Sequence, residues 1–103
     1  MNYRNRKFLD LAHKVNNCQM QMPDICEIYS PEGCEPAHSN NQTDGKGTGI
    51  KSHDFTHVAA CHSCHFEYDQ GNRFNREQKR DFFERGFRST LALYFLNKWV
   101  VVK

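Results

Sequence analysis

The chain has 103 residues, a formal net charge of +2, 38% hydrophobic residues and 13% aromatic residues. These values argue against a disordered chain and fit one small domain over residues 1–103 with a limited core. No apolar stretch approaches the ~20 residues of a membrane span, and the N-terminal residues lack the apolar core of a signal peptide. We therefore expect a cytoplasmic protein without a membrane partner.

The first half of the chain alternates short predicted elements with loops. Apolar residues at near-helical spacing predict an amphipathic helix over residues 4–15. The alternating stretch Gln19–Met22 predicts a short strand that stops at Pro23. A brief extended piece is expected at residues 37–40. Residues 43–54 form a glycine-rich segment without phosphate-loop spacing, which we interpret as a flexible connection.

The second half is predicted to be helical. One helix should cover residues 58–70, open within a cysteine pair and end near Gly71. Asn75 followed by Gln78 resembles a capping box, so a second helix should begin there, with a break or hinge at Gly86. We expect a core at about residues 16–72 and a helical extension at about residues 75–100. The side chains of the extension that are expected to pack in the core are Leu91, Tyr94, Phe95 and Trp99.

Five cysteines in a chain expected to be cytoplasmic point to metal binding rather than disulfides. Two of them are separated by two residues and open a predicted helix, whose positive N-terminal end favours thiolates. A second pair lies farther upstream with a wider gap, and there Cys26 with Cys34 is a competing choice. The favoured set for one structural Zn²⁺ is Cys18, Cys26, Cys61 and Cys64.

The stretch Cys61–His65 also matches the C-x-x-C-H pattern of c-type haem attachment. Such haem is attached after export, and no export signal is visible in the sequence. Haem would also leave three other cysteines unexplained. We therefore expect no haem.

A second metal site is predicted on the same helix. His65 and Asp69 are four residues apart, so on a helix they lie on one face and can bind one ion together. His62 shares that face and is a possible additional or substitute ligand. One imidazole and one carboxylate suit Mg²⁺, Mn²⁺ or Zn²⁺.

The motifs CQMQMPDIC, AHSN, GTGIKSHD and ACHSCHFEYD follow one another along the chain. In this order and approximate spacing they resemble the HNH endonucleases, whose ββα-metal fold places a catalytic histidine on a β-ribbon against a metal-binding helix. The similarity is greater to the small YbcO-like nucleases encoded by phages and prophages, and it covers about residues 9–90. It implies an α+β protein with a zinc-stapled ββα-metal core, an N-terminal helix and a C-terminal helical extension.

The resemblance implies a metal-dependent endonuclease that hydrolyses DNA phosphodiester bonds, with a role in phage or prophage DNA processing or recombination. His38 would be the general base that activates a water. Asp54, near the position of the family's middle Asn, would orient His38 or the loop. His65 and Asp69 match the family's helix ligands for a catalytic Mg²⁺ or Mn²⁺, with Zn²⁺ as the alternative.

The chain departs from the HNH pattern at Ala37, where many members carry a further metal ligand. The missing ligand of the catalytic metal would then be supplied by His53, by His62 or by water. The rival interpretation is a non-catalytic zinc module that binds nucleic acid or a protein, which needs the cysteines but not the catalytic residues. A homodimer through the terminal helix would let two sites cut two strands. Basic residues expected to contact DNA phosphates are Arg73, Arg76, Lys79 and Arg80.

Overall fold

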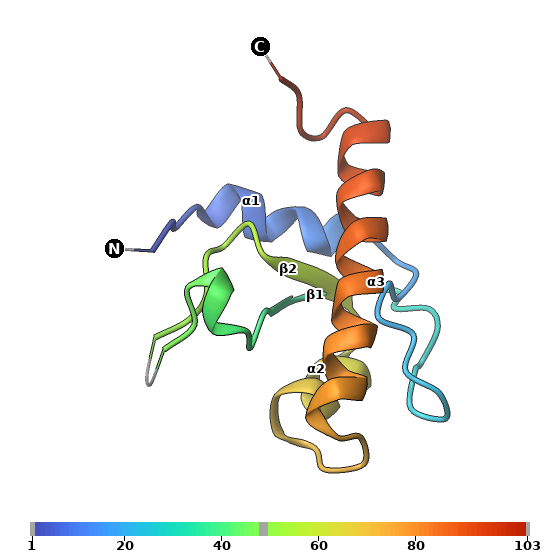
Figure 1. Cartoon of the computed structure of the whole chain (residues 1–103). Coiled ribbons are helices and arrows are strands. Elements are labelled where there is room, and N and C mark those ends of the chain that lie inside the picture. Colours follow the sequence, from blue (N-terminus) through green and yellow to red (C-terminus); the bar gives the residue numbers. More distant parts are fainter. Residues whose placement is uncertain (1, 48–49, 103) are drawn as a thin grey trace.

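The computed structural model describes residues 2–47 and 50–102; Thr48 and Gly49, which belong to the predicted glycine-rich segment, lie outside the described residues. Two antiparallel strands lie among three α-helices and two 3-10 helices (Figure 1). In chain order the elements are α1 (Arg6–Asp10), η1 (Leu11–Lys14), β1 (Glu35–His38), η2 (Gln42–Asp44), β2 (His57–Ala60), α2 (His62–Gln70) and α3 (Arg76–Leu96). Among the described residues, no helix is long and apolar enough to cross a membrane.

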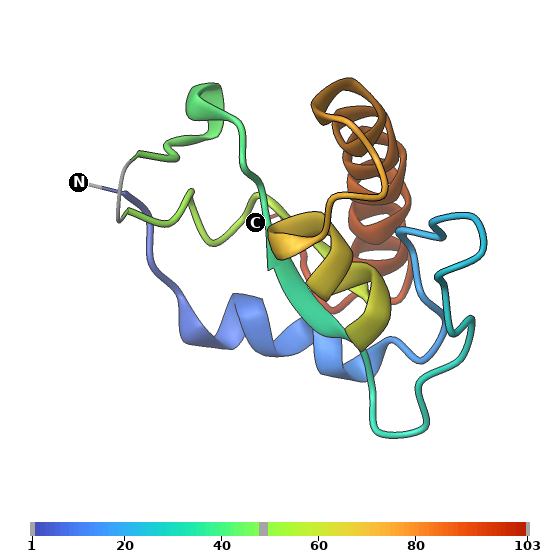
Figure 2. The ribbon, with the colours of Figure 1, turned by 90° about the horizontal axis from the view of Figure 1, so that it is seen from below.

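The two strands pair so that each face of the sheet is buried against a different cluster. Ala37 is opposite Val58, and both belong to a cluster with Cys64 and Tyr68 of α2. Ala59, on the other face, packs with Ala12 of η1. Successive strand residues point to opposite faces, so α2 covers one face and the N-terminal helices cover the other. Figure 2 shows α1 and α2 approaching β1 from different sides.

The predicted N-terminal helix is present as α1 and η1, with the Asn5 side chain accepting the Phe8 N–H at the helix start. The capping box at Asn75 and Gln78 is also confirmed, because each side chain accepts the other residue's backbone N–H. Such reciprocal bonds satisfy donors that a helix start would otherwise leave unpaired. They set the first residue of α3 as the sequence predicts.

The predicted strand at Gln19–Met22 is wrong. Met20 and Met22 are both buried, as their alternation suggests, but Gln21 has a φ of 53°, which breaks the extended backbone. The backbone turns here because the Gln21 N–H bonds back to the Cys18 sulfur. Alternating burial therefore arises from a tight loop around a sulfur atom.

The predicted opening of a helix within the cysteine pair is confirmed, but its predicted span from residue 58 is wrong, because residues 57–60 form β2 and all four are buried. The helix begins at His62, after Cys61 has accepted the Cys64 N–H at its N-cap. The stretch HVAA is short and apolar on both faces, a pattern that periodicity alone does not assign to strand or helix. In the folded protein this stretch is buried on both faces and forms a strand.

Helix α3 is continuous through Gly86 and ends at Leu96, so the predicted hinge and the extension to Trp99 are wrong. Tyr94 is fully buried and Trp99 packs beside it from beyond the helix end, whereas Phe95 is 46% exposed. Gly86 lies where α3 crosses the loop before the sheet. A Cβ there would meet the Gln19 carbonyl oxygen and the Val58 Cγ1 at 2.8 Å each. The glycine is therefore required by close packing.

We predict that Gly86→Ala destabilises the protein by about 1–3 kcal/mol, the usual cost of overpacking a tight contact. At an unconstrained helix position the same substitution would stabilise by roughly 0.5–1 kcal/mol. The sign of the change therefore separates the two cases. Urea unfolding of both proteins measures it, and a gain in stability would contradict the packing seen here.

Candidate functional site

Four cysteines meet at the junction between the loop after η1 and the start of α2. Their sulfur atoms all lie within 4.8 Å of one another. Tetrahedral Zn–S bonds of about 2.3 Å would place sulfurs about 3.8 Å apart, so the cluster fits a Zn²⁺ ion with little adjustment. Three of the four residues are buried, as a structural site requires. The four are Cys18, Cys26, Cys61 and Cys64.

Each sulfur of the cluster accepts a backbone N–H. Residues in the left-handed region bring two of these donors into place: Gln21 donates to Cys18 at 3.5 Å, and Ile28, with a φ of 67°, donates to Cys26 at 3.2 Å. The Met22 N–H donates to Cys64, and the Glu27 N–H donates to Cys61, each at 3.4 Å. Hydrogen bonds from uncharged donors stabilise thiolate charge. The loop is thus shaped to support several thiolates at one point.

The thiols of the cluster shift one another's pKa in opposite directions. A hydrogen bond from Cys64 lowers the pKa of Cys18 to about 5, although burial opposes ionisation. The same hydrogen bond, followed by burial, raises the pKa of Cys64. Burial also raises the pKa of Cys26 to about 11. Cys18 can therefore ionise near neutral pH, whereas Cys26 and Cys64 hold their protons, so a cation would be needed to ionise these two sulfurs as well.

Cys34 takes no part in this cluster. It is fully buried with Ala12, Val15, Ala59 and Tyr94 on the other face of the sheet. Burial raises the pKa of its thiol to about 12. The structure therefore places Cys26, and not Cys34, beside the C-x-x-C pair, and Cys34 serves as a small apolar residue.

His38, at the end of β1, is paired with Asp54. The His38 Nε2 lies 2.9 Å from the Asp54 Oδ1, and the two side chains are 18% and 5% exposed. Asp54 also accepts the Asn5 N–H at 2.6 Å and an Arg4 contact at 3.4 Å. Burial alone would raise the pKa of Asp54, but the hydrogen bonds from His38 and Asn5, together with the nearby Arg4 guanidinium, lower it. An ionised Asp54 only accepts, so the His38 Nε2 carries the proton and Nδ1 is left with a free lone pair.

A buried histidine holds the backbone of Asp54 from the other side. His57 is 1% exposed, its Nδ1 lies 2.7 Å from the Asp54 carbonyl oxygen, and its Nε2 lies 2.8 Å from the Tyr94 hydroxyl. Burial lowers the pKa of His57, so the ring is neutral. Because a carbonyl accepts, Nδ1 carries the proton and Nε2 accepts from Tyr94. A hydrogen-bonded chain thus runs from α3 to the His38–Asp54 pair.

His65 of α2 lies between two carboxylates. Its Nε2 is 3.1 Å from the Asp69 Oδ2, and its Nδ1 is 2.7 Å from the Glu35 Oε1. The other oxygen of Glu35 lies 3.0 Å from the Nδ1 of His62. The hydrogen bond to Asp69 raises the pKa of His65; burial opposes this change, and Glu35 adds to it. Sequence reasoning missed Glu35, because nothing in its local sequence indicates that it will meet the histidines of α2.

The predicted catalytic residues form two neighbouring groups and not one cluster. Among residues 2–47 and 50–102, the four cysteines are the only set of three or more Cys, His, Asp or Glu residues with donor atoms this close together. The groups are joined through Asn40, whose backbone N–H bonds the Tyr68 hydroxyl at 2.9 Å. Tyr68 precedes Asp69. The segment after His38 is therefore fixed against the helix that carries Asp69.

The two further candidate ligands lie in different places. His62 is exposed and shares Glu35 with His65. His53 stacks on Phe55 with ring centroids 5.0 Å apart, and its Nδ1 accepts the Tyr3 N–H. Ala37, at the position of a further HNH ligand, is fully buried in the core. Of the two histidines, only His62 is therefore placed on the metal face of α2.

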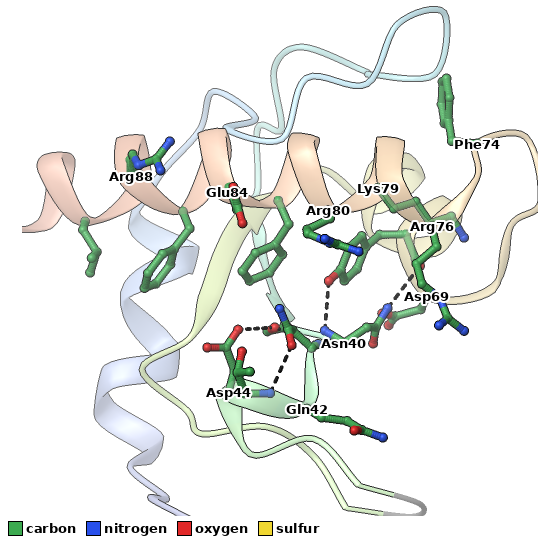
Figure 3. Close-up of a pocket in the computed structure, with 17 residues that line it drawn as sticks. Asn40, Gln42, Asp44, Asp69, Phe74, Arg76, Lys79, Arg80, Glu84 and Arg88 are labelled. Carbon is green, nitrogen blue, oxygen red and sulfur yellow. Dashed lines mark hydrogen bonds between the residues drawn. The ribbon is translucent and has the colours of Figure 1, made fainter.

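A cleft of about 1010 Å³ separates α3 from residues 39–44, and Asp69 lines it. Figure 3 shows Arg76, Lys79 and Arg80 near Asp69 at one end of this cleft, with Arg88 towards the other end. Arg73 does not line the cleft and pairs with Asp24 at 3.4 Å. Three of the four predicted basic residues therefore share one surface.

The fold and the site together define a small α+β protein with a four-cysteine centre that can hold a metal ion such as zinc. The sequence model of the family described as "Putative nuclease YbcO" matches residues 8–96. The chain belongs to this family. Among solved structures, a protein described as "a putative bacteriophage protein" from Escherichia coli str. K-12 substr. MG1655 has the same fold, with a TM-score of 0.66 and 21% identity. The match covers 88% of this chain and 99% of that one. No curated protein matches the sequence.

We predict that Cys64→Ala abolishes binding of one zinc per chain and lowers the melting temperature sharply, since structural zinc contributes directly to folding. Cys34→Ala is the matched control, because it removes a buried thiol outside the cluster. It should keep the zinc and lose only a modest amount of stability. Elemental analysis of the purified proteins and thermal unfolding measure both effects. Full zinc content in Cys64→Ala would contradict the assignment.

We also predict that His57 stays neutral well below the usual histidine pKa of about 6.5. Its folded-state pKa is lowered, so its contribution to stability is present above about pH 6.5 and is lost as the pH falls through the folded value. Long-range ¹H–¹⁵N spectra of the histidine rings should show a neutral Nδ1–H tautomer at pH 6. A charged ring at that pH would contradict the hydrogen-bonded chain to Tyr94.

Proposed function

We propose that the protein is a metal-dependent endonuclease of HNH type that hydrolyses phosphodiester bonds in DNA. The family is named for nucleases, which implies a nucleic-acid substrate. The order β1, β2, α2 is the order that a ββα-metal core requires. The observation that carries the proposal is the His38–Asp54 pair at the end of β1, next to the helix that bears His65 and Asp69.

His38 is the general base in this proposal. Its Nε2 proton is held by an ionised Asp54, so Nδ1 is available to take a proton from an attacking water. Among the described residues, Nδ1 has no hydrogen-bond partner. Asp54 is held in turn by Asn5 and Arg4, so the ring has a fixed tautomer and orientation before substrate binds. After proton transfer the imidazolium is stabilised by the adjacent carboxylate.

His65 and Asp69 are the metal ligands. Their Nε2 and Oδ2 atoms are 3.1 Å apart, a separation that suits two ligands of one ion at about 2.0–2.2 Å. A bound Mg²⁺ or Mn²⁺ would polarise a non-bridging phosphate oxygen and stabilise the leaving oxygen. Glu35 accepts from the His65 Nδ1 and thereby orients the ring, as carboxylates commonly do beside metal-binding histidines. A metal ion would replace the proton that the His65 Nε2 shares with Asp69.

The test is cleavage of plasmid, single-stranded and branched DNA with Mg²⁺, with Mn²⁺ or without either ion. We expect cutting that depends on the added ion and falls by about 10²–10⁴-fold in His38→Ala, the usual contribution of a general base. His13→Ala, an exposed histidine on η1, is the matched control and should cut normally. Asp54→Asn should lie between the two, because it removes the charge but keeps the shape.

Two outcomes would contradict the proposal. Equal cutting by His38→Ala and the native protein would show that another group is the base or that a contaminant acts. No cutting by native protein with any ion or substrate would favour a non-catalytic zinc module. Circular dichroism of each variant should match that of the native protein, since the His38 side chain is at the end of the strand.

A further inference from the structure

The cleft beside Asp69 is lined by the arginines that make no ion pair or side-chain hydrogen bond among the described residues. Among the described residues, three arginines have no ion pair and no side-chain hydrogen bond, and all three line this cleft: Arg76, Arg80 and Arg88. The remaining arginines are all occupied. Arg4 binds Asp54 and backbone carbonyls, Arg6 pairs with Asp10, Arg73 pairs with Asp24, and Arg85 donates to the Met20 carbonyl.

The free cations are spaced along one helix. Arg76 and Arg80 are one turn apart, about 6 Å along the axis of α3 at 1.5 Å per residue. The Lys79 ammonium uses one donor on the Gly71 carbonyl, which leaves two donors for an anion. Figure 3 shows these three side chains gathered at the Asp69 end, whereas Glu84 and Asp44 occupy the middle of the cleft. The positive charge is therefore concentrated next to the proposed metal ligand.

The cleft also has an apolar floor. The rings of Tyr68, Phe83 and Phe87 follow one another with centroid distances of 5.3 and 5.9 Å. Tyr68 and Phe83 are almost wholly buried, so the apolar surface open to a ligand comes from half-buried Phe74, Phe87 and Leu91. On the opposite wall, the amides of Asn40, Asn41 and Gln42 offer donors and acceptors. A closed duplex presents phosphates and groove edges to a protein, with its base faces hidden. A single strand offers phosphates and apolar base faces together.

We propose that this cleft binds a single nucleic-acid strand and leads it to the His65–Asp69 site. The inference rests on the proposed nuclease function and names the substrate class as single-stranded or locally opened DNA. A basic groove combined with aromatic side chains is the usual construction for binding single strands. The volume of about 1010 Å³ is near the upper limit for small-molecule sites of roughly 300–1,000 Å³. It suits a few nucleotides of one strand and is too small to enclose a duplex.

The experiment measures binding of a fluorescent 15-nucleotide strand and its duplex by anisotropy, without added Mg²⁺ or Mn²⁺, over a series of salt concentrations. The native protein should bind the single strand at least 10-fold more tightly than the duplex. The double variant Arg76→Gln/Arg80→Gln should lose at least 10-fold of this affinity. Its salt dependence should fall by about 1.4 in the log–log slope, since each phosphate contact on a single strand contributes about 0.7.

The matched control is Arg6→Gln/Lys7→Gln, which removes the same charge from exposed positions on α1, away from the cleft. It should bind within 2-fold of the native protein. An equal loss in both double variants would overturn the inference, because net charge alone would then explain binding. Equal affinity for duplex and single strand would also overturn it.

The inference and the nuclease proposal can fail separately. Selective strand binding that depends on Arg76 and Arg80, in a protein that cuts nothing, would uphold the cleft and reject the nuclease. Cutting of closed duplex that is unaffected by Arg76→Gln/Arg80→Gln would uphold the nuclease and reject the cleft. Both double variants alter exposed side chains, so their melting temperatures should stay close to that of the native protein.

Discussion

The convergence of four sulfurs on one point is the constraint on which the rest of the structure depends. It joins the loop that contains Cys18 and Cys26 to the first turn of α2 through Cys61 and Cys64. The loop has little regular structure of its own, and four of its backbone N–H groups donate to sulfur atoms. A small domain buries too little apolar surface to fix such a loop by packing alone. A cation at the centre would supply the missing stabilisation and would set the position of α2 against the sheet.

Helix α3 connects the core to both proposed functional regions. One face enters the core at Phe83, Gly86, Thr90 and Tyr94, spaced by three or four residues. The Thr90 hydroxyl accepts the Ala59 N–H at 3.2 Å and so pairs an outer backbone group of β2. Tyr94 bonds His57, which holds Asp54 and through it His38. The neighbouring face lines the cleft, so the same packing that positions His38, the proposed base, also positions the unpaired arginines.

The sequence predicted the parts of the fold that depend on local chemistry. The capping box of α3, the N-terminal helix and the cysteine-bearing start of α2 follow from side chains close in sequence. The errors arose where contacts between residues far apart in the sequence determine the local structure. Met20 and Met22 alternate because they surround a sulfur-centred loop, and Gly86 is a close-packing position and not a hinge. The strand at residues 57–60 could not be separated from a helix, because both of its faces are buried.

The site was predictable in its residue types but not in its partnerships. Glu35 was missed because a lone carboxylate in a strand carries no signal until α2 brings His62 and His65 to it. The cleft was missed because the sequence does not show which arginines form ion pairs within the folded protein. Arg73 pairs with Asp24, whereas Arg76 and Arg80 line the cleft without an ion pair among the described residues, although all three lie in one basic stretch. Pairing within the folded chain, and not charge density along it, therefore identifies which cations are free to meet a phosphate.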